Sequence, residues 1–282
     1  MTVEFVDIKA EQNTCELSGY FDKRLLVFRV QFENTKLNFG VEDLHKLRVE
    51  IKKQRAFLRF LEILSEGGFS RKAYYKILAS IFKPGGRLRE THVNQSLVLL
   101  YRSYALDNYK HFLSKRNKRQ TKKLGKALRK FNLDGLNNLN SIVAEILTDV
   151  ELEKIRHKAL GFLNYELQTI RSLRPFIASD NDLHQIRFHT KALGYITKFI
   201  NELSPAQQLN DLLRMAKPTE KLIGNWHDRV VLRNSLDSYL QKHPGAPDTE
   251  EARKLIRQIN NRNKASLKTI ADRLDGFINI VL

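Results

Sequence analysis

Residues 43–55 read D-L-H-K-L-R-V-E-I-K-K-Q-R, and residues 182–195 read D-L-H-Q-I-R-F-H-T-K-A-L-G-Y. A trio of histidine, arginine and lysine recurs between the two segments at a constant offset of 139 positions (45 to 184, 48 to 187, 52 to 191). The trio consists of His45, Arg48 and Lys52 in the first copy, and of His184, Arg187 and Lys191 in the second. A constant offset over three positions indicates an internal duplication.

A second pair of related segments follows each copy by about 40 residues and supports the duplication. G-R-L-R-E begins at Gly86 and G-N-W-H-D begins at Gly224, which aligns Glu90 with Asp228 at an offset of 138 (90 to 228). We expect these two carboxylates to cap a helix start or to pair with basic residues there. The sequence therefore predicts one domain over residues 1–282, built from a first repeat at 12–147 and a second at 148–282.

Helical periodicity dominates the apolar pattern, which predicts an all-α fold of two pseudo-symmetric, roughly four-helix bundles in tandem. Apolar residues at helical spacing run from Leu17 to Phe32 and from Leu44 to Leu61, and a further helix is expected from about residue 88 through Tyr109. Glycine and proline mark the expected helix breaks. These lie at Gly67-Gly68, Pro84-Gly85-Gly86, Pro175, Ser204-Pro205, Lys217-Pro218 and His243–Pro247.

The cations of each copy share one side of their helix. At 100° per residue, five residues of the first copy fall within an arc of roughly 80° and form a ladder about 20 Å long. They are His45, Arg48, Lys52, Arg55 and Arg59, and the second copy continues as His184, Arg187, Lys191 and Lys198. The neighbouring arc is apolar, with Leu44, Leu47, Ile51 and Leu58, so the cations should flank a buried stripe. Two such ladders facing each other would line a basic groove or pore.

The formal net charge of +18 indicates a polyanionic partner. The densest basic run lies at residues 115–130 and includes Lys115, Lys118, Arg119 and Lys122. This run either extends the ligand track or forms a solvated helix face that raises the local anion concentration, and the sequence leaves both interpretations open.

Several classes of protein are disfavoured. A single cysteine, Cys15, allows no intramolecular disulfide, and no apolar run or leader pattern indicates a membrane span or signal peptide, so we expect a cytoplasmic protein without membrane partners. The histidines lack metal-ligand spacing, which predicts no metal and no cofactor. No catalytic constellation is present, and the aromatic residues are expected in the core.

The two signatures, H-x-L-R-V-x-x-K-K-x-R from His45 and H-x-I-R-x-x-x-K-x-x-x-Y from His184, resemble those of CHAD domains, the conserved-histidine α-helical domains. The resemblance implies a central basic pore, inorganic polyphosphate as ligand and association with polyphosphate granules. It also implies which positions contact polyphosphate: His45, Arg48, Lys52, Lys53, Arg55, His184, Arg187 and Lys191. Gly194 departs from the family pattern, which often has arginine there.

The sequence thus predicts a non-enzymatic module that binds polyphosphate. The alternative is a helical protein that binds RNA or DNA with the same basic surface, because +18 charges attract any polyanion. Next to a polyanion the charged imidazole is favoured, so we expect raised pKa values for His45 and His184 in the complex, with tighter binding as the pH falls from about 8 to 6.

Overall fold

The computed structural model describes residues 4–101, 104–148 and 150–280, with the side chains of residues 4–18, 137, 140 and 148 outside that description. Within these ranges the chain forms nine α-helices, one short 3-10 helix and no strand, which confirms the predicted all-α class. Among the described helices, none combines the length and the apolar character that a membrane span requires.

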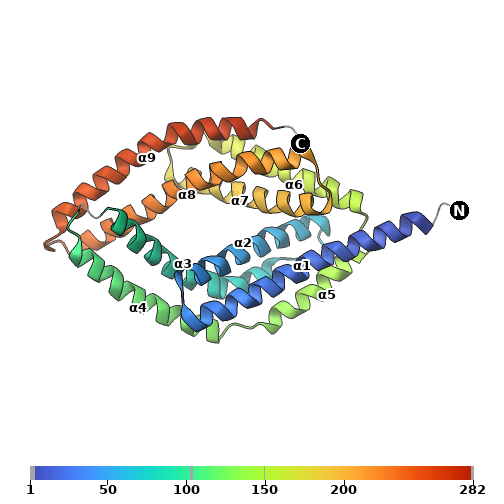
Figure 1. Ribbon diagram of the computed structural model, residues 1–282, viewed down its shortest axis with the longest axis horizontal. Coiled ribbons are helices and arrows are strands. Elements are labelled where there is room, and N and C mark those ends of the chain that lie inside the picture. The colour runs from blue at the N-terminus through green and yellow to red at the C-terminus, as the bar shows by residue number, and fades with distance from the viewer. Residues whose placement is uncertain (1–3, 102–103, 149, 281–282) are drawn as a thin grey trace.

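The helices follow one another in the same order in both halves of the chain (Figure 1). The first half contains α1 (Glu4–Asn38), α2 (Val41–Leu64), α3 (Lys72–Leu100), α4 (Asp107–Arg129) and α5 (Asp134–Thr148). The second half contains α6 (Leu152–Leu173), the 3-10 helix (Arg174–Phe176), α7 (Asp180–Leu203), α8 (Gln207–Lys242) and α9 (Thr249–Ile278). The repeated trios lie on α2 and α7, so α1–α4 correspond to α6–α9, and α5 is an addition to the first half.

The two halves share one core where α2 packs against α7. Phe60 and Phe199 occupy equivalent positions in the two copies (60 to 199), and their rings meet edge to face at a centroid distance of 5.8 Å. Phe57 packs edge-on against the same Phe199 ring at 5.1 Å. Rings at these distances are favourable beyond the apolar area that they bury. The crossing of α2 and α7 therefore fixes the two trios relative to each other.

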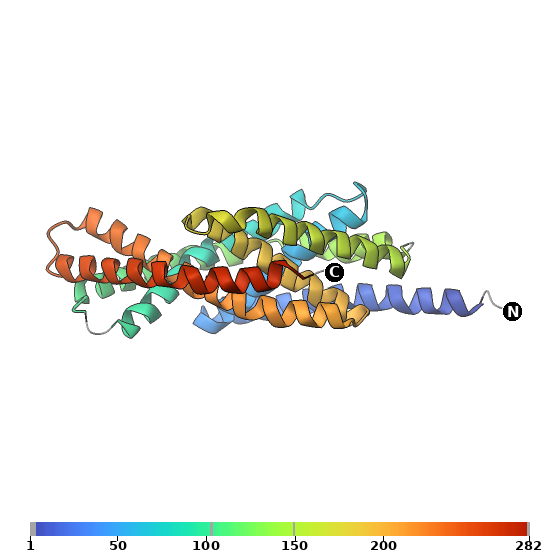
Figure 2. The same cartoon turned by 90° about the horizontal axis from the view of Figure 1, so that it is seen from above.

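A second, smaller core joins the two halves at the end of the molecule remote from both chain termini, where α3, α4, α8 and α9 meet (Figure 1). Here Asp248 accepts hydrogen bonds from the backbone N–H of Tyr109 at 2.8 Å and from the Tyr239 hydroxyl at 2.7 Å. The Tyr109 hydroxyl donates to Ser235 at 2.8 Å. A carboxylate of one half thus caps the first turn of α4 in the other half. The view in Figure 2 shows the resulting elongated molecule, with the N-terminal part of α1 extending beyond the other helices.

The breaks predicted at Pro84-Gly85-Gly86 and Lys217-Pro218 are wrong, because α3 and α8 continue through both. The helix expected from about residue 88 through Tyr109 is also wrong, since α3 has begun at Lys72 and ends at Leu100. Tertiary packing overrides the local signal. A Cβ at Gly85 would approach Leu44 to 3.3 Å and one at Gly86 would approach an Arg48 nitrogen to 3.0 Å. The glycine pair therefore permits the close approach of α2 and its arginine to α3.

The other predicted breaks are confirmed. Helix α2 ends before Gly67, whose φ of 99° is a left-handed conformation that glycine adopts without strain. Pro175 lies in the 3-10 helix after α6, and Ser204-Pro205 and residues 243–247 separate α7 from α8 and α8 from α9.

Candidate functional site

The repeated trios lie on half-buried walls of α2 and α7. Leu44, Leu47 and Ile51 are at most 1% exposed and anchor α2 in the core, as the apolar stripe predicts. Arg48 and Lys52 flank that stripe and are half-buried, whereas His45 at the start of the ladder is exposed. On α7, Leu183, Ile186 and Leu193 form the matching buried stripe.

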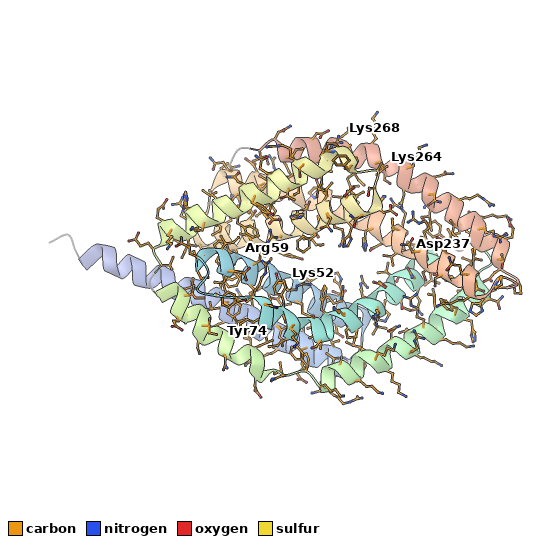
Figure 3. The ribbon with its side chains drawn as sticks, turned by 180° about the vertical axis from the view of Figure 1, so that it is seen from behind. Lys52, Arg59, Tyr74, Asp237, Lys264 and Lys268 are labelled. Carbon is orange, nitrogen blue, oxygen red and sulfur yellow. The ribbon has the colours of Figure 1, made fainter. Side chains whose placement is uncertain are left out.

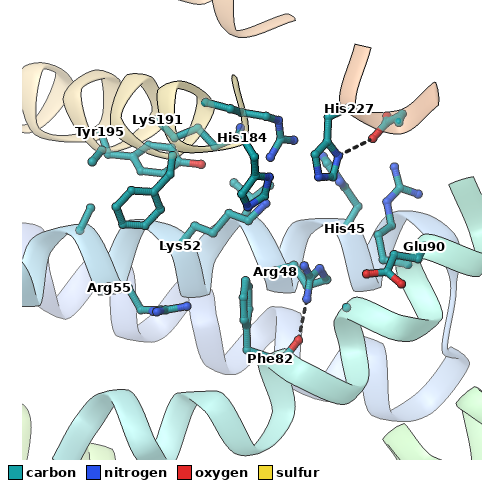
Figure 4. A pocket seen from close by; sticks show the side chains of 18 of the residues that line it. His45, Arg48, Lys52, Arg55, Phe82, Glu90, His184, Lys191, Tyr195 and His227 are labelled. Atoms are coloured by element: carbon teal, nitrogen blue, oxygen red, sulfur yellow. Dashed lines mark hydrogen bonds and ion pairs between the residues drawn. The ribbon is translucent and has the colours of Figure 1, made fainter. Parts of the chain in front are cut away.

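Both trios line one cavity of about 450 Å³, whose walls are α2, α3, α7 and α8. In Figure 4 the side chains of Lys52 and His184 extend toward each other from opposite walls. The cavity is bounded by these residues: His45, Arg48, Val49, Lys52, Arg55, Ala56, Arg59, Tyr75, Phe82, Gly86, Arg89, Glu90, Val93, His184, Arg187, Phe188, Lys191, Ala192, Tyr195, His227, Asp228 and Val231. The two ladders of the sequence thus face each other across a shared space.

Eight of the fourteen predicted site residues line this cavity: His45, Arg48, Lys52, Arg55, Arg59, His184, Arg187 and Lys191. Six do not: Lys53, Lys198, Lys115, Lys118, Arg119 and Lys122. Lys53 pairs with Glu50 at 3.3 Å, and the exposed Lys198 pairs with Glu202 at 3.8 Å. The four residues of α4 are exposed on its outer face. Lys53 does not share the cavity face because it lies one position, or 100°, beyond Lys52.

Five arginine and lysine side chains of the cavity have no carboxylate within ion-pair distance among the described residues: Arg48, Lys52, Arg55, Arg89 and Arg187. Arg48 donates to the Phe82 carbonyl at 2.6 Å and lies 4.2 Å from the centre of the Phe82 ring. Arg55 lies 4.6 Å from the ring centre of Tyr75. Carbonyl and ring contacts orient a guanidinium group without neutralising it. The positive charges of Arg48 and Arg55 are therefore held in place and left available to an anion.

Two other predicted cations are neutralised within the protein. Arg59 pairs with the fully buried Glu166, whose second oxygen lies 2.7 Å from Nδ1 of His189. Lys191 pairs with Glu220 of α8. Among the described arginines and lysines of the two ladders, Arg48, Lys52 and Arg55 of the first therefore remain without a carboxylate partner, compared with Arg187 of the second.

Burial and mutual repulsion lower the pKa values of the cavity bases. The pKa of Lys52 falls from its ordinary 10.5 to about 7, mainly through burial and then through Arg187, Lys191 and Arg48. Partial desolvation at the cavity rim and Arg89 lower the pKa of His45, while partial desolvation and His227 lower the pKa of His184. Burial also lowers the pKa of Arg48, to about 10, so this side chain stays charged. In the ligand-free protein the cavity thus holds fewer charges than its composition suggests.

The second pair of related segments, which begin at Gly86 and Gly224, contributes cavity residues that were not selected from the sequence. Arg89 and His227 occupy equivalent positions (89 to 227) and both line the cavity. The His227 and His184 rings stack at 5.1 Å. The sequence contains a signal for these two residues, because the alignment that pairs Glu90 with Asp228 also pairs the residues immediately before them.

Glu90 and Asp228 pair with basic residues, as expected, at 3.7 Å from Arg116 and 3.6 Å from His227. Their expected place at a helix start is wrong, since both lie within the continuous helices α3 and α8.

The aromatic residues are not all in the core, contrary to expectation. Tyr75, Phe82, Phe188 and Tyr195 line the cavity, and Phe188 is 49% exposed. In the part of the chain that the structure describes, no three histidine, cysteine or acidic side chains gather closely enough to hold a metal ion. The cavity is therefore a cationic space with aromatic walls.

Comparisons with known proteins agree with this architecture. The family model for the CHAD domain matches residues 20–237. The fold is similar to the crystal structure of the CHAD domain from the plant Ricinus communis, with a TM-score of 0.76 and 15% sequence identity over 93% of this chain and 91% of that chain. At that identity the likeness concerns the fold alone. No curated protein matches the sequence significantly.

Proposed function

Since this chain belongs to the CHAD domain family, we propose that its central cavity binds inorganic polyphosphate as a basic pore, without catalysing a reaction. The observation that carries the proposal is the set of unpaired cations on facing walls of one cavity: Arg48, Lys52, Arg55, Arg89 and Arg187. Half-buried positive charges without carboxylate partners are costly, and a bound anion offsets that cost.

The chemistry of a linear polyphosphate matches the arrangement of these cations. Such a chain carries a negative charge on every unit, so it requires a row of donors instead of a single point. Arginine supplies forked donors and lysine supplies a compact charge. Between His45 and Arg59 the wall formed by α2 extends for about 20 Å, at about 1.5 Å per residue. The cavity thus offers a track along which several phosphoryl units can be contacted.

Nucleic acid is the competing ligand, and the exposed basic face of α4 favours it. Lys115, Lys118, Arg119 and Lys122 are exposed to any polyanion, whereas the unpaired cavity cations are half-buried in the walls of a space of about 450 Å³. A linear polyphosphate, which carries no sugar or base, enters such a space more readily than a strand of RNA does.

Competition binding tests this assignment. Long-chain polyphosphate and a single-stranded RNA of equal charge are titrated against a labelled polyphosphate at fixed ionic strength, because affinities for polyanions depend steeply on salt. We expect polyphosphate to displace the label at least tenfold more effectively than RNA. If RNA displaces it equally well or better, the proposal is wrong.

Absence of catalysis and cellular location belong to the same proposal. We expect no release of orthophosphate from polyphosphate or triphosphate above a blank, and phosphate release that is lost on His184→Ala would overturn this part. We also expect the protein to be cytoplasmic and to associate with polyphosphate granules. A fluorescent fusion should lose its granular pattern when the polyphosphate is removed by an added polyphosphatase.

A further inference from the structure

One end of the cavity carries an exposed aromatic surface that phosphate binding does not require. Phe188 of α7 lines the cavity and is 49% exposed, and Tyr165 of α6 is 58% exposed. Their ring centres lie 6.0 Å and 5.7 Å from the guanidinium carbon of Arg59. Two solvated rings therefore flank the arginine that ends the ladder of α2.

The aromatic ring is present at one of two equivalent positions. Phe188 corresponds to Val49 in the first copy (49 to 188), and both residues line the cavity. An exposed phenylalanine offers nothing to a phosphate oxygen, and its apolar surface favours contact with another flat apolar group. The repeat thus places an exposed ring at position 188 of one cavity wall and an aliphatic side chain at the equivalent position of the other wall.

The unpaired positive charge is also distributed unevenly along the cavity. Arg59, beside Phe188, is neutralised by Glu166. Further along α2, Lys52 has no carboxylate partner among the described residues, and the cation that lowers its pKa most is Arg187, the residue before Phe188. The cavity therefore combines a neutral aromatic end with an adjoining cluster of unpaired positive charges.

This juxtaposition fits a ligand with a flat ring at one end and a chain of phosphates at the other. We propose that the cavity binds nucleoside polyphosphates, with the base against Phe188 and the phosphate chain along Arg187, Lys52 and Arg48. The inference rests on the proposed function, because the same cations bind the phosphoryl groups. Any base can stack on an aromatic side chain, so the site favours a ligand that carries a base without discriminating among the bases.

Calorimetric titration with adenosine triphosphate and with inorganic tripolyphosphate, at one ionic strength and without divalent cations, tests the inference. The measured quantity is the ratio of the two affinities, which cancels effects common to both phosphate chains. Phe188→Ala should lower the affinity for adenosine triphosphate relative to that for tripolyphosphate about 30-fold, the middle of the range for one base stacked on one aromatic ring. Phe188→Tyr keeps the ring and should keep the ratio within about twofold.

Phe176 provides a matched control. It is 60% exposed, it lies in the 3-10 helix after α6, and it does not line the cavity. Phe176→Ala should leave the affinity ratio unchanged. An equal ratio in Phe188→Ala and in the unmodified protein would overturn the inference.

Long-chain polyphosphate separates this inference from the proposed function. If long-chain polyphosphate binds tightly but Phe188→Ala leaves the affinity ratio unchanged, the nucleoside inference fails and the proposed function stands. If long-chain polyphosphate does not bind, the proposed function fails, and the inference that rests on it fails as well.

Discussion

Replacing Lys52 by methionine should stabilise the ligand-free protein while weakening its binding of polyphosphate. Lys52 lies half-buried among Arg187, Lys191 and Arg48, and its pKa falls from 10.5 to about 7. A base whose pKa is lower in the folded protein than in the unfolded chain opposes folding fully below its folded-state pKa, and this penalty is lost as the pH rises toward its unfolded-state pKa. Methionine keeps the apolar length of the lysine stem and removes the charge.

The magnitude follows from the change in pKa. One unit of pKa, a tenfold change in the acid dissociation constant of the lysine, corresponds to about 1.4 kcal/mol. The lowered pKa of Lys52 therefore destabilises the folded protein by at most roughly 4 kcal/mol at pH 7. As the pH rises from about 7 toward 10.5, the unfolded chain releases the proton that the folded protein has already lost, and the penalty falls to roughly 2 kcal/mol at pH 9. Lys52→Met should therefore raise the free energy of unfolding most at pH 7, and by about half as much at pH 9.

Urea unfolding of the ligand-free protein at pH 7 and pH 9 measures this difference. Lys268→Met is the control, since Lys268 is exposed on the outer side of α9, away from Lys52 (Figure 3). The control should change the free energy of unfolding by less than about 0.5 kcal/mol. The reasoning is refuted if Lys52→Met destabilises the protein at pH 7, or if its gain is the same at both pH values.

Three further predictions concern pH, the second ladder and the distal core. Binding of polyphosphate should tighten about tenfold from pH 8 to pH 6 at fixed ionic strength. The lowered pKa values of Lys52, His45 and His184 leave these groups partly neutral in the ligand-free protein, and a bound anion favours their protonation. An affinity that does not change with pH would exclude their contact with the ligand. Gly194→Arg should tighten polyphosphate binding about threefold while Gly194→Ala does not, because Gly194 is equivalent to Arg55 (55 to 194) and a Cβ there meets nothing within 4 Å. Equal affinities of these two variants would show that residue 194 is too far from the ligand. Asp248→Ala should cost about 3 kcal/mol in urea unfolding, because the Tyr109 N–H and the Tyr239 hydroxyl both lose their buried acceptor, and a loss below about 1 kcal/mol would contradict that role.

The sequence predicted the trios and their helices because a duplicated motif repeats at a constant offset and the helical period places its cations on one face. Whether the first trio faces the second depends on how α2 crosses α7. That crossing is fixed by packing between residues more than 100 positions apart, such as Phe60 and Phe199. Local periodicity carries no information about such contacts.

The errors have the same origin. Pro84 and Pro218 are helix breakers by local propensity, yet α3 and α8 run through them because buried residues on both sides, such as Ile81 and Leu88 in α3, hold the helix in the core. Arg59 belongs to the ladder by its spacing, but its charge is neutralised by Glu166 on α6. Carboxylates on other helices determine which cations of the ladder remain unpaired. The spacing of residues along one helix does not predict those carboxylates.

The affinity of a double variant for long-chain polyphosphate tests the central claim most directly. Arg48→Gln with Arg187→Gln removes two facing cavity charges, and the glutamine at 48 keeps a donor for the Phe82 carbonyl. Arg253→Gln with Lys264→Gln removes the same charge from the exposed face of α9. At one ionic strength and with unfolding midpoints that are not lowered, the cavity pair should lose about 100-fold in affinity and the control pair less than about threefold, as expected for charge-assisted contacts compared with long-range attraction. Equal losses in the two double variants would contradict binding in the cavity.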